Sequence, residues 1–184
     1  MIITTGSLKF KKIKALKNST LRPTSNKVRQ AIFNILRHKL KMDEWKQTAF
    51  MLDAFAGTGV VSFEALSRGV CESTLIEKDF TNFKNLIDNA EFLKVSQKVK
   101  IINEDFFNIN SLPYKYKLIY LDPPYYKKLI FPSIEKICDI NILDGNSIIV
   151  CETEKNYEFP HKLKKYTLFS KAYSTVKLTF LKYI

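Results

Sequence analysis

A short segment of the sequence combines an acid, two prolines and an aromatic residue: Asp122-Pro123-Pro124-Tyr125, directly after the apolar run 118–121. Each proline fixes its own φ angle and restricts the residue before it, so the Asp122 carboxylate and the Pro123 carbonyl point in set directions. Two such acceptors can hold both hydrogens of an exocyclic amine and turn its lone pair toward an electrophilic methyl group. Tyr125 offers a face for a flipped base, and such stacking stabilises by about 1–3 kcal/mol.

These four residues therefore predict the catalytic site of an enzyme that methylates the exocyclic amine of a nucleic-acid base. The alternative is a proline-rich loop that ends a strand, with the aromatic residue in the core.

A second segment, Asp53-Ala-Phe-Ala-Gly57-Thr-Gly59, places two glycines where a strand turns into a helix. Glycine allows a tight turn and leaves room for a ligand against the main chain. An NAD site would need a third small residue where Ser62 stands, and the Gly-Lys-Ser/Thr of a phosphate-binding loop is absent. A turn without a special role is the alternative. As cofactor-binding residues this loop contributes Asp53, Phe55, Ala56, Gly57, Thr58 and Gly59.

Two further acids end the strands that follow. Glu77 comes about 20 residues after the glycine loop, where an acid can accept both hydroxyls of a ribose. Lys78 follows it, and Asp105 is placed to accept from an adenine amino group while Phe106 packs on the ring. The alternatives are a solvated acid for Glu77 and a turn cap for Glu104 or Asp105. Together with Asp122, these residues complete the predicted cofactor site.

These residues can form one site only if they lie at the same edge of a sheet. Apolar periodicity predicts strands at 50–55, 74–77, 98–103, 117–121 and 147–151, with helices at 59–68, up to 93, and at 127–137. Such alternation indicates an α/β fold with a mostly parallel sheet and helices on both faces, and ligands bind at the carboxyl ends of its strands. Two last strands, at 166–170 and 176–182, should form an antiparallel hairpin at the sheet edge.

The segment before the sheet is basic. Residues 1–17 alternate around Gly6 and predict a small hairpin, and Thr24 or Ser25 should cap a helix that ends near Lys41. We expect one domain over 1–184, with the hairpin at 1–20, a loop and helix at 21–49 and the core at 50–184.

The formal net charge is +12, which favours a polyanionic partner such as RNA, although lysine-rich coding bias also explains part of it. Any single lysine is more simply read as solvated surface. As a group, seven cations are expected to contact RNA phosphates: Lys9, Lys11, Lys12, Lys14, Arg22, Lys27 and Arg29.

Other classes of protein are disfavoured. Cys71, Cys138 and Cys151 are odd in number and widely spaced, so they predict neither a disulfide framework nor a zinc site. With His38 and His161 as the only histidines, we expect no metal. The amino terminus lacks the apolar stretch of a signal peptide, and no run is long enough to cross a bilayer. We therefore expect a cytoplasmic protein without a membrane partner.

Several of these segments resemble motifs of a known protein family. The loop 53–59, the segments 64–69 and 75–79, and Asp122-Pro-Pro-Tyr125 look like class I methyltransferase motifs. The upstream segments Leu21-Arg-Pro-Thr-Ser-Asn-Lys-Val-Arg29 and Ala31-Ile-Phe-Asn-Ile-Leu36 are more specific. Together they resemble the bacterial 16S ribosomal RNA (guanine-N2)-methyltransferase family over nearly the whole chain.

This resemblance implies a Rossmann-like domain that uses S-adenosylmethionine to methylate the N2 amine of a guanine in small-subunit ribosomal RNA, within an assembled or assembling particle. We expect a monomer. Two departures fall in the hairpin: Thr5-Gly6-Ser7 has one glycine where two are frequent, and Lys11-Lys12-Ile13 stands where Gly-Arg-Lys is usual.

Three other functions remain open. Asp-Pro-Pro-Tyr also serves DNA adenine-N6 methyltransferases, but 184 residues leave little room for a separate DNA-reading domain. A protein-glutamine methyltransferase usually has Asn where Asp122 stands. A non-catalytic RNA-binding module on the same scaffold would not require Glu77 and the glycine loop together.

Overall fold

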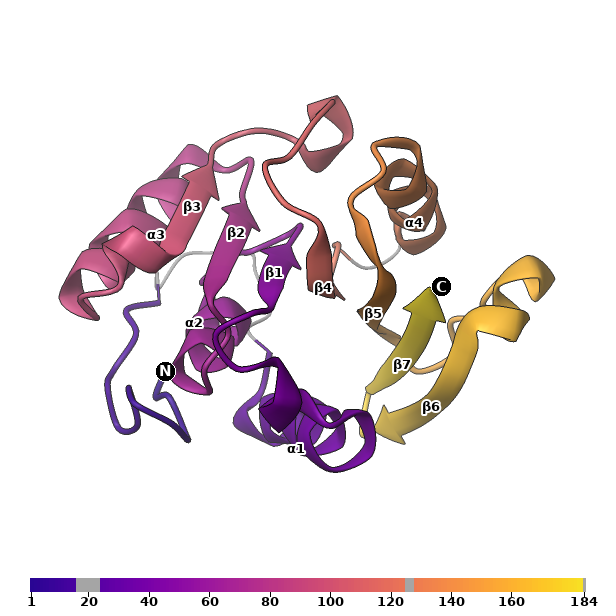
Figure 1. The fold of residues 1–184 in the computed structure, drawn as a ribbon, viewed down its shortest axis with the longest axis horizontal. Coiled ribbons are helices and arrows are strands. Elements are labelled where there is room, and N and C mark those ends of the chain that lie inside the picture. Colours follow the sequence, from indigo (N-terminus) through magenta and orange to yellow (C-terminus); the bar gives the residue numbers. More distant parts are fainter. Residues whose placement is uncertain (16–23, 125–127, 184) are drawn as a thin grey trace.

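The centre of the computed structural model is a seven-stranded sheet with the order β3-β2-β1-β4-β5-β7-β6 (Figure 1). The structure describes residues 1–15, 24–124 and 128–183. The strands are β1 (Phe50–Asp53), β2 (Glu72–Ile76), β3 (Val99–Ile102), β4 (Tyr116–Leu121), β5 (Leu143–Glu154), β6 (Thr167–Tyr173) and β7 (Val176–Tyr183). The helices are α1 (Asn26–Leu40), α2 (Val60–Ser67), α3 (Phe80–Phe92) and α4 (Ile130–Asp139).

The strand directions confirm the expected sheet. Strands β3, β2, β1, β4 and β5 pair in parallel, whereas β7 runs antiparallel to both β5 and β6. The parallel pairs need crossover helices, while β6 and β7 follow each other directly and form the antiparallel hairpin. Within this hairpin β7 lies inside and β6 forms the edge of the sheet.

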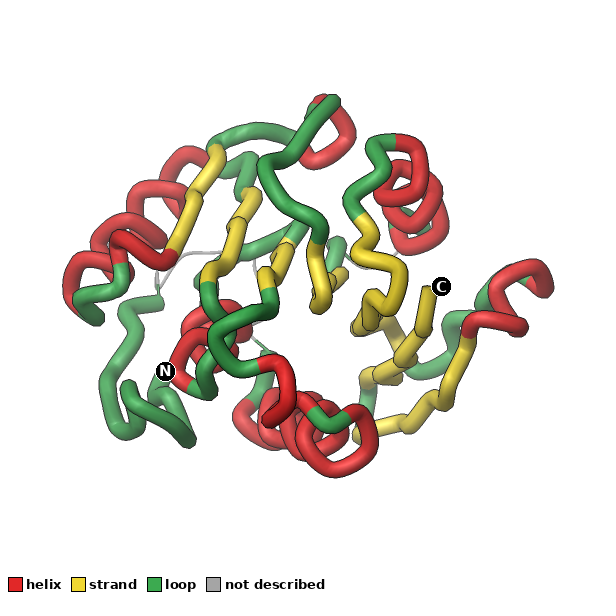
Figure 2. The backbone as a smooth tube through the Cα atoms, in the orientation of Figure 1, coloured by secondary structure: helices red, strands yellow, loops and turns green. Residues whose placement is uncertain are grey.

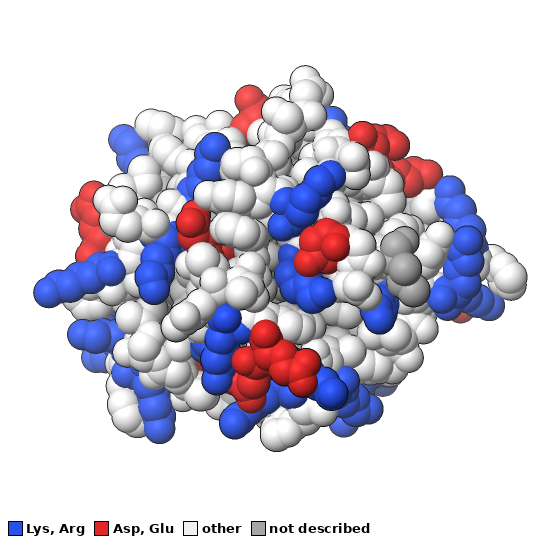
Figure 3. Space-filling view, viewed as in Figure 1, with Lys and Arg blue, Asp and Glu red and all other residues white. Residues whose placement is uncertain are grey.

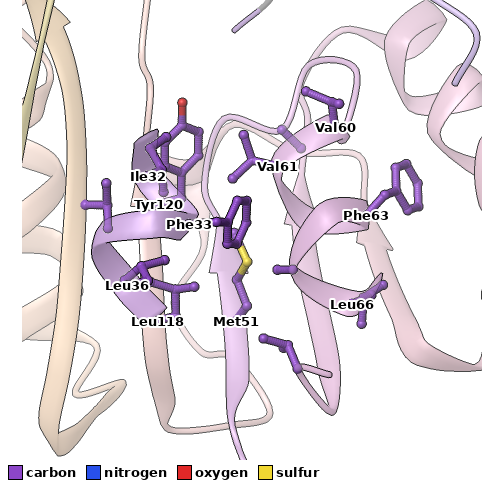
Figure 4. Close-up of a cluster of buried hydrophobic side chains, with 14 of the residues drawn as sticks. Ile32, Phe33, Leu36, Met51, Val60, Val61, Phe63, Leu66, Leu118 and Tyr120 are labelled. Carbon is purple, nitrogen blue, oxygen red and sulfur yellow. The ribbon is translucent and has the colours of Figure 1, made fainter. Parts of the chain in front are cut away.

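Helices cover both faces, as predicted (Figures 1 and 2). Helices α1, α2 and α3 contribute to one apolar cluster and α4 to the other. Figure 4 shows part of the first cluster, which includes Phe33 of α1, Val61 of α2 and Met51 of β1. Because both faces of the central strands are buried, these strands are apolar along most of their length.

The helix ends follow local signals. Ser25 caps α1 by accepting a hydrogen bond from the Val28 amide, so it is Ser25 and not Thr24 that forms the N-cap. Asp79 caps α3 in the same way by accepting from the Asn82 amide. Four short 3-10 helices were not predicted: Met42–Trp45, Ser96–Lys98, Phe106–Asn108 and His161–Tyr166. Such short turns leave little periodicity to detect.

The amino-terminal segment is less regular than the predicted hairpin. Its two arms meet at one antiparallel bridge, between Ile2 and Lys12, and the backbone between them turns at Gly6 and Phe10, both with positive φ. Ile3 and Ile13 are buried in the first cluster. The segment is therefore anchored to the protein through buried side chains instead of through a strand ladder.

Contacts with the end of α2 complete this anchoring. The Ser7 amide donates to the Ser67 carbonyl over 2.8 Å, and the Ser67 hydroxyl donates to the Thr5 carbonyl over 2.5 Å. Gly6 lies so close that a Cβ there would be 1.8 Å from the Ser67 carbonyl oxygen. We call residues 1–15 the amino-terminal hairpin from here on.

Candidate active site

The sheet order brings the two chemical segments together. Strand β4 pairs with β1, with Tyr120 opposite Asp53, and both strands run in the same direction. The glycine loop after β1 and the Asp122 turn after β4 therefore leave neighbouring strands at the same edge. Glu77 follows β2, on the other side of β1. The spatial arrangement on which the sequence interpretation depends is thus present in the structure.

The glycine loop adopts a conformation that needs its glycines. Gly57 and Gly59 have φ angles of 52° and 72°, and Gly59 stands at the start of α2. A Cβ on Gly59 would lie 2.6 Å from Cδ2 of Leu86 and 2.7 Å from the Phe63 ring. The loop is therefore fixed both by its backbone and by the packing beneath it. Thr58 and Ala56 are each 8% exposed.

Glu77 stands directly against this loop. Its Oε2 accepts a 2.8 Å hydrogen bond from the Gly57 amide, and its Oε1 accepts one of the same length from the Asp79 amide. Burial raises the pKa of Glu77, and these two amides oppose the rise. Each carboxylate oxygen keeps a second lone pair, so the side chain is held in place and can still accept from a ribose hydroxyl.

Asp53 is a buried carboxyl with an unused acceptor. The Ser62 hydroxyl donates to Oδ2 over 2.9 Å, whereas Oδ1 has no hydrogen-bond partner of normal geometry within the described residues. Burial raises the pKa of Asp53 to about 7, against the effect of Ser62. Buried acceptors are rarely left unpaired. A donor group on a bound cofactor would fill this requirement, so the residues present fit an S-adenosylmethionine site.

The Asp105 region agrees only partly with the prediction. Asp105 caps a 3-10 helix by accepting from the Phe107 amide, and the Lys78 ammonium lies 3.6 Å from its other oxygen. Phe106 is 1% exposed and belongs to the second apolar cluster. The prediction that the Phe106 ring packs on adenine is wrong, because that ring is enclosed by the core. The half-buried Phe55 and Phe107 lie edge-on beside it.

The Asp122 turn lies between acidic neighbours. Asp122 is half-buried, Pro123 is buried and Pro124 is exposed, while Tyr125 lies outside the described residues. Burial raises the pKa of the Asp122 carboxyl well above its usual value, and the charges of Glu152 and Asp53 raise it further. Burial and the neighbouring carboxyls therefore both favour the protonated form of Asp122.

Sequence reasoning missed three residues that surround Asp122. Tyr120 donates a 2.7 Å hydrogen bond to Glu152, and its hydroxyl lies 3.2 Å from that of Thr24. Tyr120 precedes Asp122 by two residues, so the two side chains share one face of β4, which was a detectable signal. Glu152 lies on β5 and was not singled out as a strand-end acid. Thr24 was considered only as a helix cap.

A small hollow opens beside the turn. It is formed by the two prolines, the buried Glu152 and the residues that lead into α4 and out of β5: Lys128, Leu129, Ile130, Thr153, Glu154 and Tyr157. Groups of His, Cys, Asp or Glu with the arrangement of a metal site do not occur within the ranges described. No described helix has the length and apolar character needed to span a bilayer.

Five of the seven predicted RNA-contacting cations are exposed: Lys9, Lys11, Lys12 and Lys14 in the amino-terminal hairpin, and Lys27 on α1. Arg22 lies outside the described residues. Figure 3 shows Lys and Arg side chains spread across the visible face with acidic groups between them. On this face, charge alone does not mark one binding patch.

The prediction that Arg29 contacts RNA phosphates is wrong. Its side chain is fully buried, where Nε lies 3.4 Å from Oε2 of Glu64 and one terminal nitrogen donates to the Ile2 carbonyl. Glu64 also accepts from Thr4 and from Arg68. Arg29 therefore fastens the amino-terminal hairpin to α2 and does not face solvent, so it is not available to a phosphate. A buried charge of this kind persists only when it is paired.

The chain is similar to known proteins over most of its length. A model of the family described as Conserved hypothetical protein 95 matches residues 1–182. Ribosomal RNA small subunit methyltransferase D of Haemophilus influenzae is 33% identical over 158 residues, which cover 84% of this chain and 79% of that protein. The protein of the same name from Buchnera aphidicola is 31% identical over 176 residues, covering 92% and 85%. The solved structure of yhhF from Escherichia coli has a TM-score of 0.83 at 26% identity, covering 100% of this chain and 97% of that one.

Proposed function

The chain belongs to the Conserved hypothetical protein 95 family, and on that premise we propose that it is an S-adenosylmethionine-dependent methyltransferase of 16S ribosomal RNA. We propose further that it modifies the exocyclic N2 amine of a guanine. The fold is the Rossmann-like fold of class I methyltransferases.

One observation carries this proposal: the Asp122 turn lies at the same sheet edge as the glycine loop, on the neighbouring strand. A methyl donor and an amine must meet in line within about 3–3.5 Å. Neighbouring parallel strands that end at the same edge of the sheet can provide this geometry. Neither segment would support methyl transfer without the other.

The same geometry supports the predicted cofactor residues. Glu77 would accept from the ribose, Asp53 offers its unpaired Oδ1, and Gly57 and Gly59 leave room against the main chain. Lys78 and Asp105, which lie 3.6 Å apart, would bound this side of the site. When bound, S-adenosylmethionine supplies an electrophilic methyl group on a sulfonium.

The chain's own contribution is to hold the amine. The Asp122 carboxylate and the Pro123 carbonyl would accept the two amine hydrogens and direct the nitrogen lone pair at the methyl group. Asp122 need not be a strong base, because the methylated nitrogen is acidic and releases its proton readily. Tyr125 would stack on the base. Positioning and preorganised polarity would thus provide most of the rate enhancement.

The substrate is inferred at two levels. Ribosomal RNA follows from the family and agrees with the net charge of +12. A guanine within the assembled or assembling small subunit, reached by the exposed lysines of the amino-terminal hairpin, is the finer proposal. We also propose that the protein acts as a monomer in the cytoplasm.

Labelled methyl transfer tests this function. The protein should be incubated with labelled S-adenosylmethionine and, in parallel, with unmethylated small subunits, naked 16S ribosomal RNA and double-stranded DNA. We expect incorporation into the ribosomal substrates and N2-methylguanosine after digestion to nucleosides. Label in N6-methyladenine of DNA would support the alternative enzyme, and cofactor binding without any transfer would support a non-catalytic RNA-binding module.

A further inference from the structure

A chain of buried polar side chains joins three separate elements beside the Asp122 turn. The Tyr120 hydroxyl on β4 donates to Oε2 of Glu152 on β5 over 2.7 Å, and it lies 3.2 Å from the Thr24 hydroxyl. The exposed fractions of Tyr120, Glu152 and Thr24 are 3%, 4% and 8%. Thr24 directly precedes the N-cap of α1. The chain therefore links the start of this helix to the centre of the sheet.

Asp122 belongs to the same group. Leu121, the last residue of β4, pairs with Cys151, so Asp122 directly after β4 and Glu152 on β5 are the residues that follow this pair. Tyr120 and Asp122 lie on the same face because they are two residues apart. Burial, Glu152 and Asp53 raise the pKa of Asp122, and hydrogen bonding from Thr24 and Tyr120 acts in the opposite direction. The two hydroxyls thus favour the ionised carboxyl.

Core stability does not explain this arrangement. Figure 4 shows the Tyr120 ring among apolar neighbours such as Ile32, with its hydroxyl oxygen at the outer end of the ring. A phenylalanine would fill the same space without a buried hydroxyl that needs partners. The carboxyls of Glu152 and Asp53 are also buried nearby, and removing such groups from water costs free energy. Such costs are typical of functional sites, where they are retained for their effect on a reacting group.

We propose that Tyr120 and Glu152 are positioning residues for methyl transfer, which act through the Thr24–Tyr120–Glu152 chain to hold the Asp122 carboxyl where it accepts from the base amine. This inference rests on the proposed function. The Tyr120 hydroxyl has a single hydrogen, so its bond to Glu152 competes with one to Asp122. When that hydrogen points to Glu152, lone pairs of Asp122 remain for the amine.

The two residues have opposite effects on Asp122, which makes the inference testable. Replacing Glu152 with Gln removes a neighbouring negative charge, so Asp122 should ionise at lower pH. Replacing Tyr120 with Phe removes a hydroxyl that favours the carboxylate, so Asp122 should ionise at higher pH. Among the described residues, Asp53 of β1 is the other charged side chain that affects the pKa of Asp122. Lys128 and Glu154 line the adjoining hollow.

A matched control lies on the same strand. Tyr116 of β4 is also fully buried, and its hydroxyl donates over 2.8 Å to Oγ1 of Thr74. Tyr116→Phe removes a comparable buried hydrogen bond at the opposite end of β4. Any change common to Tyr116→Phe and Tyr120→Phe therefore reports on stability and not on Asp122.

The experiment is the pH profile of kcat for the wild type, Tyr120→Phe, Glu152→Gln and Tyr116→Phe on the ribosomal substrate. We expect the acid limb to move to higher pH in Tyr120→Phe, to lower pH in Glu152→Gln, and not at all in Tyr116→Phe. Loss of one hydrogen bond should lower kcat of Tyr120→Phe by about tenfold near neutral pH, with the KM for S-adenosylmethionine unchanged.

Thermal unfolding provides a readout that does not need activity. A carboxyl whose folded pKa is raised above its ordinary value of 3.8 stabilises the protein below that pH and loses this contribution as the pH rises. Between pH 4 and pH 7, Tm should therefore fall less in Glu152→Gln than in the wild type, and Tyr116→Phe should follow the wild-type slope.

The outcomes separate the two proposals. A wild type that transfers no methyl group to RNA would overturn the proposed function and, with it, this inference. An active wild type whose acid limb is shifted by neither Tyr120→Phe nor Glu152→Gln would overturn this inference alone. Shifts in opposite directions, with the Tyr116→Phe limb unmoved, would support it.

Discussion

At the scale of single residues, the site concentrates carboxyl groups that are buried or half-buried. Asp53, Glu77 and Asp122 all have raised pKa values, with burial as the largest cause in each case. The three acids end neighbouring strands and stand where a cationic cofactor and a base amine would bring donors. Perturbed acids of this kind at one edge of the sheet agree with a catalytic site.

Asp122→Ala is expected to separate binding from turnover. The substitution removes one of the two amine acceptors, so kcat should fall by about 10²–10³-fold, as when one preorganised polar group is removed from other active sites. The Kd for S-adenosylmethionine, measured by calorimetry, should stay within a few-fold of the wild type. Near-normal kcat in this variant would rule out the proposed grip on the amine.

Tyr125 is predicted to act through its ring. Tyr125→Phe should retain most activity because the stacking face remains, whereas Tyr125→Ala should lose about 1–3 kcal/mol of stacking, which lowers kcat/KM by about 5- to 150-fold. Methyl transfer to the ribosomal substrate measures both variants. Equal losses in the two would show that the hydroxyl group, and not the stacking face, is what matters.

At the scale of elements, the amino-terminal hairpin is fixed to the rest of the protein by specific contacts. Ser67 at the end of α2 bonds its backbone, and the buried pair of Arg29 and Glu64 holds its Ile2 and Thr4 ends. The exposed lysines follow these anchor points, and the Lys14 amide donates to Asn89 of α3, so the lysines occupy defined positions. A flexible basic arm would bind RNA with a larger loss of conformational entropy.

Gly6→Ala should weaken this anchoring. Gly6 has a φ angle of 87°, and a Cβ would be 1.8 Å from the Ser67 carbonyl oxygen, so the hairpin must move. Gly145→Ala is the matched control, since its φ is 81° but nothing lies within 4 Å of the new Cβ. In denaturant unfolding, we expect Gly6→Ala to lose clearly more stability than Gly145→Ala, whose cost is about 1 kcal/mol of backbone strain. Equal losses would mean that the contact with Ser67 is unimportant.

At the scale of the whole molecule, charge and fold serve different purposes. The formal charge of +12 attracts RNA from every direction, and the sheet edge decides where chemistry takes place. The amino-terminal hairpin packs against α2 and α3 near one side of the sheet, far from β6 at the other edge (Figure 1). Lysines on these two sides should therefore differ in their contribution to RNA binding.

Salt dependence measures this difference. For the double variant Lys11→Ala with Lys12→Ala, the slope of log K for RNA binding against log salt should decrease in magnitude by about 1–2. The matched control is Lys164→Ala with Lys165→Ala, two adjacent exposed lysines before β6. Its slope should stay close to that of the wild type. An RNA affinity independent of ionic strength would remove the proposed phosphate contacts altogether.

Local sequence patterns were enough to predict the succession of strands and main helices and the acids near the strand ends. These features depend on local periodicity, on caps such as Ser25, and on the backbone restrictions of glycine and proline, which a short window of sequence contains. The glycine loop, Glu77 and the Asp122 turn were predicted for the same reason. The resemblance to a methyltransferase family depended on these local motifs as well.

Which of these residues meet depends on the tertiary fold. The pairing of β4 with β1, the burial of Arg29 against Glu64, the enclosure of Phe106 and the contact of Tyr120 with Glu152 join positions that are far apart along the chain. A positive charge near the amino terminus predicts a phosphate contact as readily as a buried ion pair. The two differ only in the carboxylate that the fold places beside the charge, and no local pattern contains that information.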